Sequence, residues 1–191
     1  MNTRHYSTEG VILKRKNFGE ADRLLTLFSK HYGKVKVVAK GVRRPSSRKR
    51  GSLELFNHVK CFVARGRNLD IVTEVEIMEN FSSWRKDLVK VGVAYHLAEV
   101  VERLTAEHQE HREVFELLKG AYRRLGNQGY WEHYDFINSF KLRVLQELGF
   151  LERGREHKDL DSFMNEKSLD SFIEDLINGS LRTKRFLERI S

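Results

Sequence analysis

Residues 33–40, Gly33-Lys34-Val35-Lys36-Val37-Val38-Ala39-Lys40, show most clearly which secondary structure the first part of the chain forms. Val35, Val37 and Ala39 alternate with three lysines, and this period of nearly two predicts a strand that carries its lysines on one face. The preceding residues, His31-Tyr32-Gly33-Lys34, predict a turn in which Gly33 supplies a positive φ. The positive charge here therefore belongs to folded β-structure and not to a loose arm.

Four further apolar runs flank this strand, with glycine-marked turns between several of them. They cover Gly10–Leu13, Leu24–Phe28, Leu53–Ala64 and Leu69–Ile77. Five short strands predict a small barrel, and an OB-type barrel has this number of strands. Between the third and fourth runs, residues 41–52 contain the only proline, three serines and five basic residues, which predicts an exposed loop.

Helical periodicity replaces this pattern after about residue 80. Ser82 or Ser83 is expected to cap the first helix, which runs to Leu104. Further helices are predicted over Val114–Leu125, over Tyr130–Leu148 with Gly149 ending it, over Leu169–Ile177 and over Thr183–Ile190, with a charged linker at Glu152–Asp161. The predicted fold class is α+β, with an OB-type barrel in residues 1–80 and an α-helical domain in residues 81–191.

Charge is distributed unevenly over these two parts. Residues 1–67 contain 17 Lys and Arg against 4 Asp and Glu, a balance of +13, whereas residues 68–191 contain 18 against 23, a balance of −5. A folded module with such a positive field attracts polyanions. No amphipathic basic helix precedes Ser82, so nucleic acid is favoured over an acidic membrane surface.

The predicted contacts to DNA are the basic residues of the strands and of the loop. Lysine and arginine on a loop reach phosphates at variable spacing and read no particular base. The predicted set is Lys14, Arg23, Lys34, Lys36, Lys40, Arg43, Arg44, Arg48, Lys49 and Arg50.

Aromatic side chains lie between these basic residues, and single-strand binders stack bases on exposed aromatics. Phe18 and Tyr32 stand beside turns and are stacking candidates, while Phe28, Phe56 and Phe62 are expected in the barrel core.

Catalysis and metal binding lack a matching pattern. The chain has neither a phosphate-binding loop nor a G-x-G-x-x-G motif. Glu20 and Asp22 are expected to be structural, and His108 with His111 has no third ligand at a specific spacing. The lone cysteine, Cys61, is expected in the core. We therefore expect a soluble protein of the reducing cytoplasm that is no enzyme and needs no metal or other cofactor.

Several stretches are similar to one family. They are Gly19-Glu20-Ala21-Asp22-Arg23, Ala39-Lys40-Gly41 with Arg43, Arg44 and Ser46, Leu53-Glu54-Leu55-Phe56, Ala94-Tyr95-His96-Leu97-Ala98-Glu99, the run FKLRVLQELGF at 140–150, and LRTKRFL at 181–187. In this order they resemble the bacterial DNA repair protein RecO family of recombination mediators.

The resemblance implies an OB barrel followed by a helical domain, with binding of single- and double-stranded DNA and annealing of complementary strands in the nucleoid. It also implies two partners, RecR and the tail of single-stranded DNA-binding protein, so that recombinase can load. That tail is acidic, so its site is expected among Arg123, Arg124, Lys141 and Arg143 of the helical part. Many family members carry a four-cysteine zinc module, but residues 151–180 contain no cysteine, so no zinc module is expected.

Two other functional classes remain open at this point. An RNA-binding OB protein of the translation apparatus would show the same basic field, although the acidic helical half suggests protein partners. A metal-dependent nuclease would need clustered carboxylates, and the basic part is poor in acidic residues.

Overall fold

The computed structural model describes residues 4–127, 133–152 and 168–190. These residues form two compact units. The barrel unit contains the chain up to Phe81 together with Thr105–Phe115, and the helical unit contains Ser82–Leu104 and the chain from Glu116 onward.

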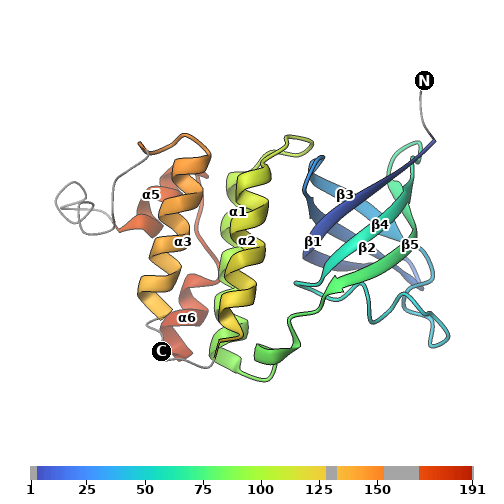
Figure 1. Ribbon diagram of the computed structural model, residues 1–191, viewed down its shortest axis with the longest axis horizontal. Helices are drawn as coiled ribbons and strands as arrows, with labels where there is room; N and C mark the ends of the chain where they lie inside the picture. The colour runs from blue at the N-terminus through green and yellow to red at the C-terminus, as the bar shows by residue number, and fades with distance from the viewer. Residues whose placement is uncertain (1–3, 128–132, 153–167, 191) are drawn as a thin grey trace. The chain divides into compact units, whose positions relative to one another are not determined.

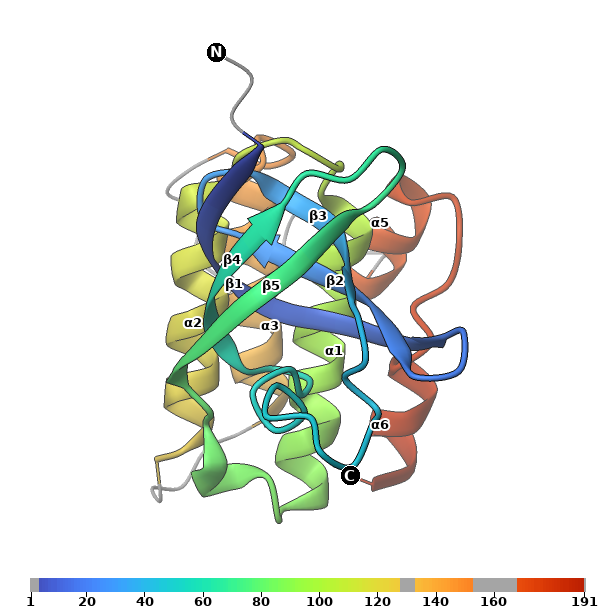
Figure 2. The same ribbon diagram turned by 90° about the vertical axis from the view of Figure 1, so that its right-hand side faces the viewer.

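The barrel unit is a closed barrel of five strands, which Figures 1 and 2 show from two sides. The strands are β1 (His5–Phe18), β2 (Asp22–Ser29), β3 (Gly33–Ala39), β4 (His58–Ala64) and β5 (Asp70–Glu79). They neighbour one another in the order β1-β2-β3-β5-β4, and only the β3–β5 pair is parallel. The prediction of a five-stranded OB-type barrel followed by helices is confirmed.

The long strand β1 closes the barrel because it pairs with two neighbours. Its first half lies against β4, from His5 opposite Ala64 to Val11 opposite His58. Its second half lies against β2, and within this pairing a register shift between Ile12 and Lys14 marks a bulge in β1. Such a bulge increases the local twist and bends the strand around the barrel.

The barrel core confirms the alternation read from residues 33–40. Val35, Val37 and Ala39 lie in one buried cluster with Leu25, Leu27 and Val63. The predicted strand from Leu53 to Ala64 was wrong in its first part, since β4 begins only at His58. Leu53 instead points into the core from a turn, and Phe56 has a positive φ of 69°. Apolar residues in a turn that closes a barrel give the same local sequence signal as a strand.

The segment Thr105–Phe115 belongs to the barrel unit although it lies far along the chain. The Phe115 ring packs on Phe28 at 6.4 Å between centroids. His108 donates its backbone N–H to the Lys34 carbonyl at 3.0 Å. A Cβ on Gly33 would lie 1.9 Å from the Gln109 carbonyl oxygen, so this approach requires glycine. The barrel unit therefore contains a segment, Thr105–Phe115, that the domain predicted for residues 1–80 did not include.

The helical unit contains a short 3₁₀ helix, Ser82–Trp84, and helices placed near the predicted positions (Figure 1). They are α1 (Leu88–Leu104), α2 (Arg112–Leu125, whose first residues belong to the barrel unit), α3 (His133–Glu147), α5 (Leu169–Leu176) and α6 (Lys184–Ile190). Helix α1 packs against α3, α5 and α6. Across the described residues, no helix is both long and apolar enough to cross a lipid bilayer.

The ends of the helices partly follow the sequence. The expected cap at Ser82 or Ser83 is wrong, because the Asp87 carboxylate accepts the Lys90 N–H at 3.1 Å and caps α1. Gly149 ends α3 as predicted, with φ of 79° and the Phe150 N–H donating to the Leu145 carbonyl at 2.9 Å. The linker predicted at Glu152–Asp161 lies almost entirely outside the described residues.

Candidate nucleic-acid interface

Four arginines of the barrel unit lie close enough to influence one another. Burial lowers the pKa of the Arg23 guanidinium, and the nearby charges of Arg15, Arg50 and Arg43 lower it further. We call these four residues the arginine cluster. Like charges held together raise the local positive potential, and three of the four arginines, Arg23, Arg43 and Arg50, belong to the predicted DNA-binding set.

One carboxylate lies within the arginine cluster. Glu54 accepts a hydrogen bond from Arg15 and, at 3.1 Å, one from Arg23. The carboxylate fixes the two guanidinium groups, yet a single negative charge cannot neutralise four positive ones. Arg15 was not in the predicted set of DNA contacts, although it lies in the run of three basic residues Lys14-Arg15-Lys16, which indicates a positively charged surface. The cluster therefore has a surplus of positive charge, and hydrogen bonds fix the guanidinium groups of Arg15, Arg23 and Arg43.

The loop that carries the other basic residues is ordered by its own backbone. We call residues 40–52 the basic loop. Figure 2 shows the chain between β3 and β4 coiling through successive turns. Arg43 N–H donates to the Ala21 carbonyl at 2.8 Å, and the Asp22 carboxylate accepts the Gly41 N–H at 2.7 Å. The side-chain amide of Asn57 holds the carbonyls of Gly51 and Ser52. The loop predicted for residues 41–52 is thus held to the rest of the barrel unit by hydrogen bonds near both of its ends.

The cations of the basic loop differ in how they are held. Lys40, Arg44, Arg48 and Arg50 are exposed. Arg43 is exposed too, but its guanidinium donates to the carbonyls of Gly19 and Glu20. Lys49 is half-buried, and its ammonium donates to the Val72 carbonyl at 3.2 Å. On β1, Lys14 is exposed. Most of the loop cations thus face solvent, where a phosphate can reach them.

Two predicted lysines on β3 have protein partners instead. Lys34 is only 8% exposed, and its ammonium donates to the Thr105 carbonyl at 2.7 Å. Its assignment as a DNA contact is corrected, because the segment from Thr105 covers that part of the strand face. Lys36 is exposed and pairs with Glu107 at 2.5 Å. That hydrogen bond is the main reason why the pKa of the Glu107 carboxyl lies below its usual range.

The predicted positions of the aromatic side chains are confirmed for most of them and wrong for one. Phe28 and Phe56 are buried as expected, whereas Phe62 was expected in the core and is 41% exposed. Phe18 and Tyr32, the two stacking candidates, are both exposed. A strand position alone does not reveal whether an aromatic faces the core or the outside of a barrel.

The residues proposed for a protein partner include one that is buried. Lys141 is 3% exposed and donates to the Asp170 carboxylate at 2.5 Å, so its assignment to a partner site is corrected. Arg123 and Arg143 are exposed. Arg124 is exposed as well, and its guanidinium lies 5.4 Å from the Phe136 ring centroid.

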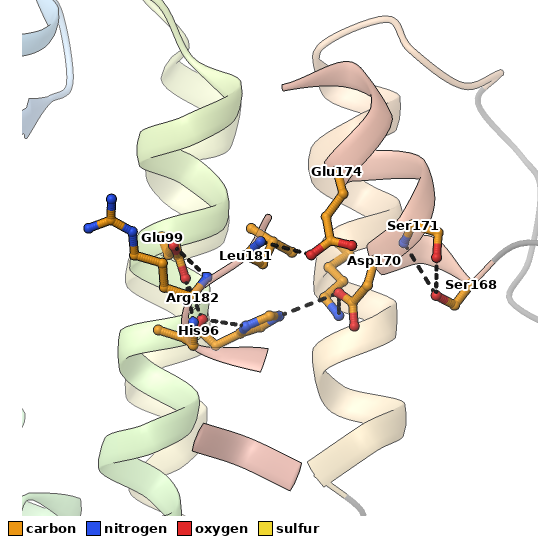
Figure 3. A network of polar contacts seen from close by, with 10 residues as sticks. His96, Glu99, Ser168, Asp170, Ser171, Glu174, Leu181 and Arg182 are labelled. Carbon is orange, nitrogen blue, oxygen red and sulfur yellow. Dashed lines mark hydrogen bonds and ion pairs between the residues drawn. The ribbon is translucent and has the colours of Figure 1, made fainter. Parts of the chain in front are cut away.

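Through Asp170, Lys141 joins a polar network inside the helical unit, in which Figure 3 labels His96, Glu99 and Asp170. His96 is 1% exposed, and its Nδ1 lies 2.8 Å from the Thr183 hydroxyl. That hydroxyl is also 2.6 Å from the Glu99 carboxylate, to which it donates. Nδ1 is therefore the donor to Thr183, and Nε2 is left facing Asp170 at 3.8 Å. Burial is the main cause that lowers the pKa of His96 to about 4.

The structure also places the residues weighed for metal binding and catalysis. Within the described ranges, no group of three or more His, Cys, Asp and Glu side chains could hold a metal ion. His108 lies in the connection between α1 and α2 with φ of 61°. Cys61 lies in the core, and burial raises the pKa of its thiol to about 12, which keeps it protonated and unreactive.

Comparison with known proteins matches both parts of the chain to the same family. Residues 1–81 match the family model "Recombination protein O N terminal", and residues 85–151 match "Recombination protein O C terminal". The chain belongs to the RecO family. The resemblance read from its motifs is confirmed.

Individual RecO proteins support this assignment. DNA repair protein RecO of Roseiflexus sp. (strain RS-1) is 40% identical over 151 residues, which are 78% of this chain and 52% of that protein. DNA repair protein RecO of Pelotomaculum thermopropionicum is 35% identical over 145 residues, 76% of this chain and 56% of that protein. The chain thus spans about half the length of the curated relatives it matches.

Proposed function

We propose that this chain is a DNA repair mediator without catalytic activity, which binds single- and double-stranded DNA and anneals complementary strands. The arginine cluster with the adjoining basic loop carries this proposal. Cations on a fixed scaffold hold phosphates without reading bases, and a protein that anneals arbitrary strands must leave base edges free to pair. The RNA-binding alternative is not favoured, because both matched family models are of a recombination protein.

We further propose that the helical unit serves protein partners. The family resemblance suggests RecR and the acidic tail of single-stranded DNA-binding protein, whose displacement would help recombinase to load. The exposed Arg123, Arg124 and Arg143 supply positive charge for such a tail, whereas Lys141 is already paired inside the unit. Localisation at the nucleoid in the cytoplasm belongs to the same proposal.

The experiment measures binding and annealing of labelled oligonucleotides by the full chain between about 50 and about 200 mM salt. Arg44 and Arg48 are changed together to Ala, because both are exposed and, unlike Arg43, hold no carbonyl of the β1–β2 turn. Loss of two phosphate contacts should make the salt slope of single-strand binding shallower by about 1.4, from about 0.7 per contact. All sequences should lose affinity alike.

The matched control removes the same charge elsewhere. Arg143→Ala with Arg189→Ala changes two exposed arginines of the helical unit. That variant should keep the wild-type slope. If the wild-type chain neither binds nor anneals oligonucleotides at low salt, the proposed function is wrong. If both double variants change the slope equally, net charge and not the basic loop governs binding.

A further inference from the structure

Three side chains from separate elements of the barrel unit meet at the start of β1. Tyr32, in the turn between β2 and β3, lies against Tyr6 with ring centroids 4.8 Å apart and an interplanar angle of 50°. The Arg65 guanidinium, just beyond β4, lies 5.2 Å from the Tyr6 ring centroid. Tyr32 is 38% exposed and Arg65 is exposed, so solvent reaches this group. We call Tyr6, Tyr32 and Arg65 the tyrosine platform.

Hydrogen bonds hold the platform in place without a ligand. The Tyr6 hydroxyl donates to the Asp70 carboxylate at 2.8 Å, and burial together with this bond raises the pKa of Tyr6 far above its usual range. The Asp70 carboxylate also accepts the Gly66 N–H at 3.2 Å. The Tyr32 N–H donates to the Ser29 hydroxyl at 3.1 Å. The Tyr6 ring is thus fixed by its own hydroxyl, and the Tyr32 ring packs on it from a turn whose backbone is tied down. A ring that is preorganised by such packing loses little conformational entropy when a base stacks on it.

The platform and the arginine cluster lie at opposite ends of one strand. Arg23 is the second residue of β2, and Tyr32 follows the end of that strand by three positions. From Arg23 to Ser29 the strand advances six residues, which at about 3.3 Å per residue corresponds to roughly 20 Å, and Tyr32 lies in the turn just beyond that end. Single strands occupy about 4–16 nucleotides on an OB fold, so one strand can reach both groups.

We propose that the tyrosine platform is a base-stacking site for single-stranded nucleic acid, with Tyr32 as the ring that meets the base. The proposal rests on the proposed function and adds a second kind of contact to it. The arginine cluster binds phosphates, which every nucleotide carries. The platform binds the face of a base, which a duplex hides between neighbouring pairs. It therefore confers preference for unpaired strands, and backing by a guanidinium strengthens such stacking.

The test compares two oligonucleotides of about 12 nucleotides, a length within the usual range for an OB fold. One is oligothymidylate and the other is an abasic chain of equal length, which keeps the phosphates but has no bases. Tyr32→Leu keeps apolar cover over Tyr6 but removes the aromatic face. We expect it to lower affinity for oligothymidylate about five- to a hundredfold and to leave affinity for the abasic chain unchanged.

Two further variants make the result decisive. Tyr134→Leu changes a tyrosine of the helical unit that is 50% exposed, and it should affect neither oligonucleotide. Tyr32→Trp should keep binding and should lose indole fluorescence when oligothymidylate, but not the abasic chain, is added. This variant also reports on the site if Tyr32→Leu folds poorly.

The outcomes separate the two proposals. Wild-type chain that binds neither oligonucleotide overturns the proposed function. Wild-type chain that binds both equally, or a Tyr32→Leu variant that loses affinity for both equally, overturns the stacking site and leaves phosphate binding standing. Unchanged tryptophan fluorescence on addition of oligothymidylate also overturns the stacking site.

Discussion

Arg23 of the barrel unit and Lys141 of the helical unit both pair with a carboxylate, yet they are used differently. Arg23 shares Glu54 with Arg15, and two more arginines lie near it. Lys141 is buried with Asp170 as its partner. Burial is the first cause that lowers the pKa of both groups, but neighbouring cations add to it for Arg23, whereas Asp170 opposes it for Lys141. The unneutralised positive charge around Arg23 can attract a ligand, whereas the buried pair of Lys141 and Asp170 contributes to the stability of the helical unit.

The largest effect is expected from breaking the buried pair. Asp170→Ala should lower the free energy of unfolding by about 3–5 kcal/mol, because the Lys141 ammonium would remain buried without its carboxylate. Denaturant unfolding of the full chain measures this loss. Arg143→Ala, on the exposed side of the same helix α3, is the control and should change stability by no more than about 0.5 kcal/mol.

A double variant sharpens this prediction. Lys141→Met together with Asp170→Ala removes both charges, so the chain should be more stable than with Asp170→Ala alone. A double variant as unstable as the single one would mean that packing around α5, and not the unpaired ammonium, causes the loss.

The second prediction concerns acid. Folded His96 has a pKa lowered to about 4, and the unfolded chain takes up this proton near pH 6.5. The unfolded state therefore binds more protons in this window, so stability should fall by roughly 2–3 kcal/mol as pH falls from about 6.5 to about 4. Burial is the largest cause of this lowered pKa, the charges of Lys141 and Lys184 lower it further, and the carboxylates of Asp170 and Glu99 oppose them.

Replacement of the imidazole tests that assignment. His96→Asn keeps a donor for Thr183 and should flatten the pH dependence of unfolding between about pH 6.5 and about pH 5. The Glu99 carboxyl has a lowered pKa and affects stability only below its usual range near 4.5, outside this window. Exposed His5 changed to Asn should leave the slope as it is. An unchanged slope in His96→Asn would assign the acid sensitivity to another group.

The third prediction turns to the barrel unit and compares two glycines. Gly33 and Gly19 have nearly the same positive φ, 61° and 57°. A Cβ at Gly19 meets nothing within 4 Å, whereas a Cβ at Gly33 meets the Gln109 backbone. Gly19→Ala should cost about 1–2 kcal/mol from the backbone alone, and Gly33→Ala at least about 2 kcal/mol more. Equal losses in thermal unfolding would show that Thr105–Phe115 moves away at little cost.

The smallest effect on stability is expected at the arginine cluster, where the effect on binding is the informative one. Glu54→Gln should change the free energy of unfolding by less than about 1 kcal/mol, because these ion pairs are partly exposed. Given the proposed function, it should raise affinity for single-stranded DNA about two- to fivefold at low salt, and the gain should shrink at high salt. Glu113→Gln, an equal change in charge at another exposed site, is the control. Unchanged affinity would place the DNA away from Glu54.

The sequence was a reliable guide where one face of an element is buried against its immediate neighbours. Alternation in residues 33–40 identified β3 and its core side, and Gly149 identified the end of α3, since each depends on local geometry. The strand predicted to begin at Leu53 was wrong, because Leu53–Phe56 form a turn that covers the barrel core and buries apolar side chains as a strand does. Ser82 and Ser83 misled because Asp87, five and four residues later, caps the helix.

The basic residues show the limit of such reasoning. Lys34 and Lys36 have the same sequence pattern around them. Thr105 and Glu107, from a distant part of the chain, pack on the strand, so that Lys34 is buried and Lys36 forms an ion pair. Arg143 and Lys141 are two residues apart on α3, and only the packing of this helix against its neighbours α1 and α5 decides which becomes interior. The tyrosine platform likewise joins three elements that no sequence spacing connects.

Hydrophobic period, turn residues and net charge are local or additive properties. The five-stranded barrel, the helical second part, the basic first 67 residues and the resemblance to RecO could therefore all be predicted from the sequence. Which cations keep a surplus of charge, which are buried and which aromatic rings meet became known only from the folded chain. Burial and pairing depend on contacts between residues far apart in the chain, and such contacts leave no periodic trace in the sequence around either partner.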